Sequence, residues 1–247
     1  MIKDIEFILK KIFFSESHLL KKRLSRAIKN NYEKELAIIE QFADKSKDAL
    51  DVGVYRGVYS FKLSQNFKKV HAFEANPKLY PYIEKNLKKI IHNISIYNFA
   101  LSDRNGETKL KLPKRSKSIF KNNIEELFQL GAASIHPHKT FKEYVEIVTK
   151  MKKLDDIKIN NKIGFIKIDV EGHELEVIKG ASRTIKENKP ILLVEIEERH
   201  SKRTLSESIS IINNYGYKSF YVEGLDLIGF NNLNENVKNN NFYFIPK

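Results

Sequence analysis

Acidic and histidine side chains gather behind two apolar runs in the second half of the chain. One run leads into the letters IKIDVEGHE, and the other leads through LLVEIEERH. Carboxylates and imidazoles are the usual general bases of enzymes, and the ordinary pKa of histidine lies near neutrality. We therefore predict a catalytic group at the ends of these runs. Its members are Asp169, Glu171, His173, Glu195 and His200.

Three members of this group have a structural alternative. Glu171 can serve as a charge at a helix terminus, and His173 can be a solvated helix residue. Glu195 lies inside an apolar run, where a carboxylate is costly unless it is paired or functional. Catalysis and structural pairing therefore explain Glu195 equally well, and the identity of the general base stays open.

A second acid–glycine unit lies upstream, in the letters DVGVYRG. A glycine after a strand lets the backbone turn tightly and approach a ligand, and a helix that starts at the second glycine offers free N–H groups to an anion. The unit lacks both the dinucleotide pattern and the Gly-Lys-Ser/Thr of a phosphate loop. We predict cofactor contacts from Asp51, Gly53, Val54, Tyr55 and Gly57.

The next two strands add polar and small residues at the same sheet edge. Glu74 follows the glycines by about 20 residues, the spacing at which an acid accepts hydrogen bonds from a ribose diol; the alternative is a helix N-terminal charge. The third strand ends in small and apolar residues that suit the wall of an adenine ring. The cofactor residues predicted here are Glu74, Ala75, Ala100, Leu101, Ser102 and Asp103.

Strand and helix signals alternate from residue 48 onward, which predicts an α/β fold with a mostly parallel sheet and helices on both faces. The final two strands are close enough to pair antiparallel. The expected strands are 49–52, 69–74, 94–99, 163–168, 191–196, 217–221 and 242–245. The expected helices are 58–66, 78–88, 173–187 and 205–214.

Two segments depart from this alternation. Residues 1–46 are predicted to be a basic helical extension, which either packs on the domain or lies on anionic lipid. Residues 47–247 form the main domain, with an insertion at about 104–150. A connection this long favours a functional role, and its basic part, 113–150, suits an anionic acceptor. We expect a strand pair around 108–112 and 144–149.

Composition narrows the possible functions. The 247 residues carry a net charge of +13 and include no cysteine, so disulfides and zinc–thiolate sites are excluded. No apolar run approaches the roughly 18 residues of a membrane span, and the N-terminus does not resemble a signal peptide. We expect a cytoplasmic protein, with peripheral contact at the inner membrane surface as an alternative. Signatures of nucleic-acid binding are lacking.

Together these motifs resemble the FkbM family of S-adenosylmethionine-dependent methyltransferases. The matching pieces are DVGVYRGVYS, HAFEANP, NFALSDRNGE, IGFIKIDVEGHELEVIKGA and ILLVEIEERH, which extend over roughly residues 48–222. The resemblance implies a class I methyltransferase fold with seven strands and a reversed final hairpin. It also implies S-adenosylmethionine as cofactor and methylation of a hydroxyl, often on a sugar or glycan. Where the family commonly has Ala-Asn, this chain has Val54-Tyr55.

The resemblance places Asp169 at the methionine end of the cofactor or at the reacting hydroxyl. A divalent ion held by Asp169, Glu195 and a histidine is an alternative to a general base. We expect a saccharide or glycan acceptor for surface polysaccharide or glycolipid synthesis, with an anionic or a lipid-linked acceptor among the options. Methylation of a small metabolite is a second hypothesis. A cofactor-binding adaptor without catalysis is a third, although the joint presence of Asp51, Glu74 and Asp169 argues against it.

Overall fold

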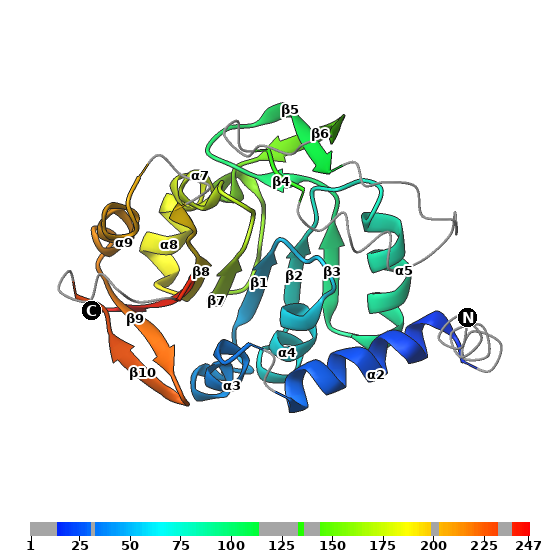
Figure 1. The fold of residues 1–247 in the computed structure, drawn as a ribbon, viewed down its shortest axis with the longest axis horizontal. Coiled ribbons are helices and arrows are strands. Elements are labelled where there is room, and N and C mark those ends of the chain that lie inside the picture. Colours follow the sequence, from blue (N-terminus) through cyan, green and yellow to red (C-terminus); the bar gives the residue numbers. More distant parts are fainter. Residues whose placement is uncertain (1–13, 31–32, 114–132, 136–143, 199–202, 232–238) are drawn as a thin grey trace.

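A computed structural model describes residues 14–30, 33–113, 133–135, 144–198, 203–231 and 239–247. Its centre is one sheet flanked by helices on both sides (Figure 1). Within these described ranges, no helix is both long and apolar enough to cross a membrane.

The central sheet has the strand order β10-β9-β11-β8-β7-β1-β2-β3. The five strands from β8 to β3 are parallel, whereas β11 is antiparallel to both of its neighbours. The predicted parallel sheet and antiparallel final pair are confirmed; β10 adds an eighth strand to the expected seven. The bounds are β1 Asp48–Val52, β2 Val70–Phe73, β3 Ile94–Tyr97, β7 Ile163–Ile168, β8 Ile191–Glu195, β9 Tyr217–Glu223, β10 Asp226–Gly229 and β11 Asn241–Pro246.

Alternating side chains of the central strands feed two apolar cores. In β7, Phe165 packs into one core, and Ile166 and Ile168 pack into the other. This two-sided burial explains why the parallel strands are continuous apolar runs. The first core is covered by α2 (Glu16–Lys29), α3 (Glu35–Ile38), η1 (Ile39–Phe42), α4 (Val58–Asn66) and α5 (Tyr80–Ile90). The second is covered by η3 (Leu154–Asp156), α7 (Glu174–Gly180), α8 (Ser182–Asn188) and α9 (Leu205–Asn213).

A smaller sheet stands over the carboxyl edge of the central strands (Figure 1). It has the order β4-β6-β5, from Ala100–Leu101, Tyr144–Lys152 and Gly106–Pro113. The strand pair expected in the insertion is therefore present. The Oγ1 of Thr149 donates to the carbonyl of Ala75 at 2.8 Å and fastens the small sheet to the loop after β2.

Two predicted elements have different ends in the structure. The helix expected over 173–187 is two helices, because the side chain of Asp155 accepts hydrogen bonds from the N–H groups of Arg183 and Thr184. This cap starts a new helix at Ser182. The strand expected over 94–99 ends at Tyr97, and Ala100 then joins the smaller sheet.

The N-terminal helices share the core of the main domain. Leu20 and Leu24 of α2 are buried in the same cluster as Phe165. The helices α2, α3 and η1 are thus an integral cover of the sheet. Residues 1–13, with part of the basic stretch, lie outside the described residues, and lipid contact stays a prediction.

Candidate active site

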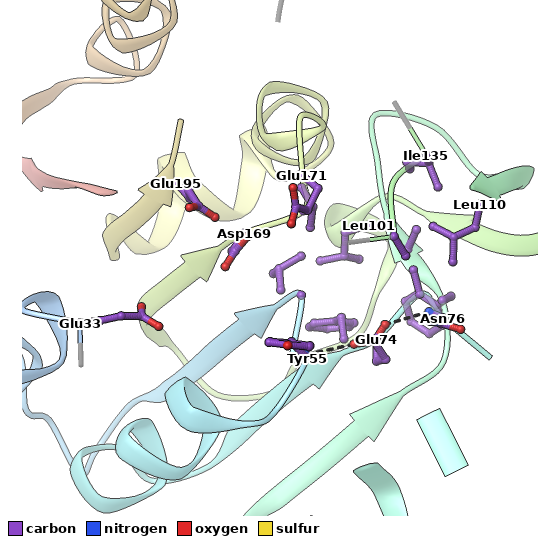
Figure 2. A pocket seen from close by; sticks show the side chains of 18 residues that line it. Glu33, Tyr55, Glu74, Asn76, Leu101, Leu110, Ile135, Asp169, Glu171 and Glu195 are labelled. Carbon is purple, nitrogen blue, oxygen red and sulfur yellow. Dashed lines mark hydrogen bonds between the residues drawn. The ribbon is translucent and has the colours of Figure 1, made fainter. Parts of the chain in front are cut away.

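A pocket of about 370 Å³ opens at the carboxyl edge of β1, β2 and β7, which we call the edge pocket. Figure 2 shows that the labelled polar residues of this pocket lie mainly toward its two ends. Glu33, Asp169, Glu171 and Glu195 gather at one end, and Glu74 with Asn76 lies at the other, with Tyr55 between them. Phe99, Ala100, Leu101, Leu110 and Ile135 supply apolar lining.

Glu74 is a buried acid that its own neighbours hold in place. Its Oε2 accepts the N–H of Tyr55 at 3.1 Å, and its Oε1 accepts the N–H of Asn76 at 2.9 Å. Burial nevertheless raises the pKa of Glu74 to about 7. The pocket therefore contains a fixed carboxyl group next to apolar side chains. The remaining lone pairs of this carboxyl group can accept hydrogen bonds from hydroxyl groups.

The loop after β1 is shaped by unusual backbone angles. Gly53 has a φ of +91°, and a Cβ there would lie 1.8 Å from the carbonyl oxygen of Asp169. Tyr55, with a φ of 49°, is one of the few non-glycine residues in this region. Gly57, at +79°, is the N-cap of α4. Gly53, Tyr55 and Ala75 line the edge pocket, whereas Val54 faces a neighbouring cleft.

Asp51 lies beneath this loop rather than in the pocket lining. It is only 1% exposed, and the Oγ of Ser60 in α4 donates to its Oδ2. Burial raises the pKa of Asp51 to about 7. The observed contact links β1 to α4, so the direct influence of Asp51 is on the position of the loop.

The charged or ionisable side chains of Lys167, Asp169 and Glu195 interact with one another at the polar end of the pocket. Burial, a hydrogen bond with Asp169 and the negative charge of that carboxyl group raise the pKa of Glu195 to about 9, which favours the protonated form of Glu195 as a hydrogen-bond donor to Asp169. The Nζ of Lys167 lies 3.8 Å from Oδ2 of Asp169. Asp169 thus has a neutral donor and a cation beside it, with space in the pocket in front.

Lys167 was missed by the sequence analysis, although it carries a recognisable signal. A lysine inside the apolar strand GFIKI is costly to bury without partners, and here it is 1% exposed. Its Nζ donates to Oδ1 of Asn241 at 3.0 Å and lies 4.9 Å from the ring centroid of Tyr59. The same side chain therefore ties β7 to β11, α4 and the pocket.

The loop between β7 and α7 gives Glu171 and Glu174 different environments. Glu171 lines the edge pocket with a φ of 59°, and its carbonyl accepts the hydroxyl of Ser134 at 2.7 Å. Glu174 turns inward and accepts the N–H groups of Val170 and Gly172. Burial raises the pKa of Glu174 to about 7. Glu174 was not among the predicted site residues. Its two hydrogen bonds stabilise the loop that carries Glu171.

Three predicted site residues lie beside the pocket and not in its lining. The Nε2 of His173 is 2.9 Å from the hydroxyl of Ser102, and its Nδ1 is 3.7 Å from Glu176. Asp103 pairs with Lys179 at 3.0 Å. These contacts join α7 to the end of β4. His200 lies outside the described residues, so its predicted role stays a prediction.

Pocket residues from distant segments were also missed. Glu33 comes from the turn between α2 and α3, and Leu110, Ala133 and Ile135 come from the insertion. No local motif marks them, because the fold alone brings them to the edge. In the described part of the chain no cluster of three metal-ligating side chains occurs. Since His200 is not described, the metal alternative remains open.

The strand order, with β11 reversed beside β8 and an acid after β2 in an edge pocket, defines a class I methyltransferase. The sequence matches the methyltransferase FkbM domain over residues 51–219, and the chain belongs to this family. No curated protein matches the chain.

One solved structure supports this fold. The methyltransferase FkbM from Methylobacillus flagellatus KT has a TM-score of 0.51 at 18% identity, with 81% of this chain covered. The match spans only 44% of that protein's chain. A TehB-like SAM-dependent methyltransferase from Corynebacterium glutamicum has a TM-score of 0.44 at 11% identity, with 92% of this chain and 98% of the other covered.

The family's cofactor, S-adenosylmethionine, fits the residues of the edge pocket. A ribose diol matches the fixed carboxyl group of Glu74, and a flat adenine ring matches the apolar side chains of Phe99, Ala100 and Leu101. The glycine at position 53 lets the backbone pass close to the end of β7. The methionine portion then has the polar end of the pocket, near Asp169, available to it.

Proposed function

We propose that the protein is an O-methyltransferase that methylates a hydroxyl of a sugar or glycan. The observation that carries this proposal is the position of Asp169 in the lining of the pocket, flanked by Lys167 and by Glu195, whose raised pKa favours its protonated form. A sugar hydroxyl is a poor nucleophile, so a group that accepts its proton accelerates the transfer. Membership of the FkbM family supports methyl transfer in general.

The bound cofactor supplies an electrophilic methyl group on a positively charged sulfur. With the cofactor bound, methyl transfer to the acceptor oxygen would break the carbon–sulfur bond and release the hydroxyl proton, which Asp169 would accept. Alignment of oxygen and methyl carbon contributes a large part of the rate. Lys167 offsets the carboxylate charge before transfer, and Glu195 holds the carboxylate orientation by its hydrogen bond.

Glu74 and the apolar wall hold the nucleoside part in this proposal. Asp51 and Gly53 act indirectly, because they set the course of the loop that carries Tyr55. Glu171 lines the same pocket as Asp169, where its carboxylate can accept a hydrogen bond from a second hydroxyl of an acceptor that reaches into this pocket. His173 lies outside the lining, and its hydrogen bond with Ser102 stabilises the position of the apolar wall.

A screen of mono- and oligosaccharides with isotope-labelled S-adenosylmethionine tests the proposal. We expect methyl ethers that survive mild base, which methyl esters do not, and product formation that depends on Asp169. Calorimetry with S-adenosylmethionine runs in parallel. Failure to bind the cofactor would favour the non-catalytic adaptor, and methylation confined to non-sugar metabolites would favour the second hypothesis. Activity lost on exhaustive chelation would favour the metal alternative.

A further inference from the structure

A second cleft adjoins the edge pocket at its polar end. It has a volume of about 730 Å³ and is walled on one side by α2, so we call it the α2 cleft. The two spaces share the lining residues Glu33, Gly53, Tyr55 and Asp169. A molecule in the α2 cleft therefore reaches the same carboxylate that the proposed reaction uses.

Guanidinium groups dominate the charge of this cleft. Arg23 and Arg26 stand three positions apart in α2 and so point to the same side of the helix. Arg56 approaches from the loop after β1. The two carboxylates in the lining are already engaged: the hydroxyl of Tyr59 donates to Glu33, and Lys167 lies beside Asp169.

An aromatic ring lies at the boundary between the two spaces. Tyr55 is 36% exposed, and the guanidinium carbon of Arg56 lies 5.0 Å from its ring centroid. Its backbone N–H bonds to Glu74, which fixes the residue in its left-handed conformation. An aromatic face suits the carbon–hydrogen face of a sugar ring, and arginine forks suit carboxylate or phosphate groups.

We propose that the α2 cleft is the acceptor subsite, and that it selects a sugar bearing an acidic group, which Arg23 and Arg26 bind while Tyr55 packs on the ring. The inference rests on the proposed methyl transfer and adds the acceptor's chemical class and location. The net charge of +13 favours the approach of an anionic acceptor.

A competing source of negative charge is the carboxylate of the cofactor's own methionine portion. The α2 cleft is about twice as large as the edge pocket, which is more space than a short amino-acid end requires. Leu20, Leu24 and Ala27 also give it an apolar wall, which suits the body of a larger molecule. The experiment separates these two sources.

The test compares 4-nitrophenyl β-D-glucuronide with 4-nitrophenyl β-D-glucoside, which differ in a carboxylate at one carbon. Binding to the full chain, saturated with S-adenosylhomocysteine, is measured by calorimetry at low salt. We expect the glucuronide to bind roughly tenfold more tightly, in line with charge-assisted hydrogen bonds. The preference should shrink as salt screens the arginines.

The double variant Arg23→Gln/Arg26→Gln should reduce this preference to about twofold. Lys21→Gln/Lys22→Gln is the matched control, since it removes the same charge from exposed positions of α2 outside the cleft lining. The control should keep the full preference. Both variants change exposed side chains, and thermal melting checks that both are folded.

Three results would overturn the inference. The first is that the wild type binds the two probes equally or binds neither. The second is that the arginine variant and the lysine variant lose the preference for the glucuronide to the same extent. The third is that the arginine variant loses affinity for S-adenosylmethionine but keeps the preference for the glucuronide. The last would assign the arginines to the cofactor's carboxylate. A wild-type protein that does not bind S-adenosylmethionine would instead refute the proposed function, which is a separate outcome.

Discussion

At the scale of single residues, the candidate site depends on acids whose protonation is set by burial. Glu74 and Glu195 both have raised pKa values, but their surroundings differ. Glu74 accepts two backbone N–H groups, which favour its charged form, whereas Glu195 faces another carboxylate, which favours its neutral form. Similar acids at the same sheet edge thus become an acceptor and a donor of hydrogen bonds.

Replacement of Glu74 by glutamine should weaken S-adenosylmethionine binding by roughly 10- to 100-fold, because a charged acceptor for the ribose diol is lost. Calorimetry measures the change, with Glu107→Gln, an exposed acid outside the pocket lining, as control. For the wild type we expect affinity to fall as the pH drops below about 7, where Glu74 gains a proton. Affinity unaffected by the variant would contradict the ribose assignment.

The pair Asp169 and Glu195 yields a contrast between two conservative variants. Asp169→Asn should lower kcat by about 100-fold or more, since the proposed proton acceptor disappears. Glu195→Gln should keep most activity at pH 7, because an amide N–H replaces the O–H donor of a group whose pKa is about 9. Initial rates with labelled cofactor, across pH 6 to 9, measure both effects. The reverse order of losses would make Glu195 the base.

At the scale of elements, the sequence predicted most of the frame of the site. The helix 58–66 and the strand 163–168 have the bounds that the apolar pattern predicted, because each reads as one periodic run between clear ends. The acids at the carboxyl edge could also be predicted, because they come at or directly after the ends of the predicted strands in the sequence. The pocket wall from α2 was not predictable, and the insertion was predicted to be functional without its individual lining residues, since the neighbours of these residues are fixed by tertiary packing and not by local pattern.

The break between α7 and α8 shows the same limit. Asp155 caps α8 from a segment 28 residues away, so no signal inside the helix itself marks the break. Local patterns also gave no reason for the glycine at position 180. Its place is set by β4, because a Cβ on Gly180 would lie 1.9 Å from the carbonyl oxygen of Ser102.

Gly180→Ala should therefore push α7 away from the end of β4. We expect a loss of about 1–3 kcal/mol in the free energy of unfolding, typical of overpacking. A weaker affinity for S-adenosylmethionine should accompany it, since Ala100 and Leu101 line the pocket. Denaturant titration and calorimetry measure the two effects. Gly229→Ala, where a Cβ meets nothing within 4 Å, is the control, and equal stability of both variants would refute the packing argument.

At the scale of the whole molecule, the buried acids make stability depend on pH. Asp51, Glu74 and Glu174 have pKa values raised to about 7, and Glu195 to about 9. At these four groups the folded chain therefore binds more protons than the unfolded chain above pH 4 to 5. By linkage, the free energy of unfolding falls as pH rises through this window, up to about 7 for three groups and about 9 for the fourth.

We expect the Tm of the cofactor-free protein to fall by at least about 4 °C between pH 6 and pH 9, since a loss of 1 kcal/mol lowers Tm by about 2–4 °C at this chain length. Glu174→Gln should flatten the slope: the amide oxygen can still accept the N–H groups of Val170 and Gly172, but no buried charge forms. Saturation with S-adenosylmethionine should flatten it further, because binding favours the charged form of Glu74. A Tm that stays level or rises with pH over this range, in the wild type without cofactor, would mean that these carboxyl groups are already ionised at pH 6 and that their surroundings are more hydrated than their burial implies.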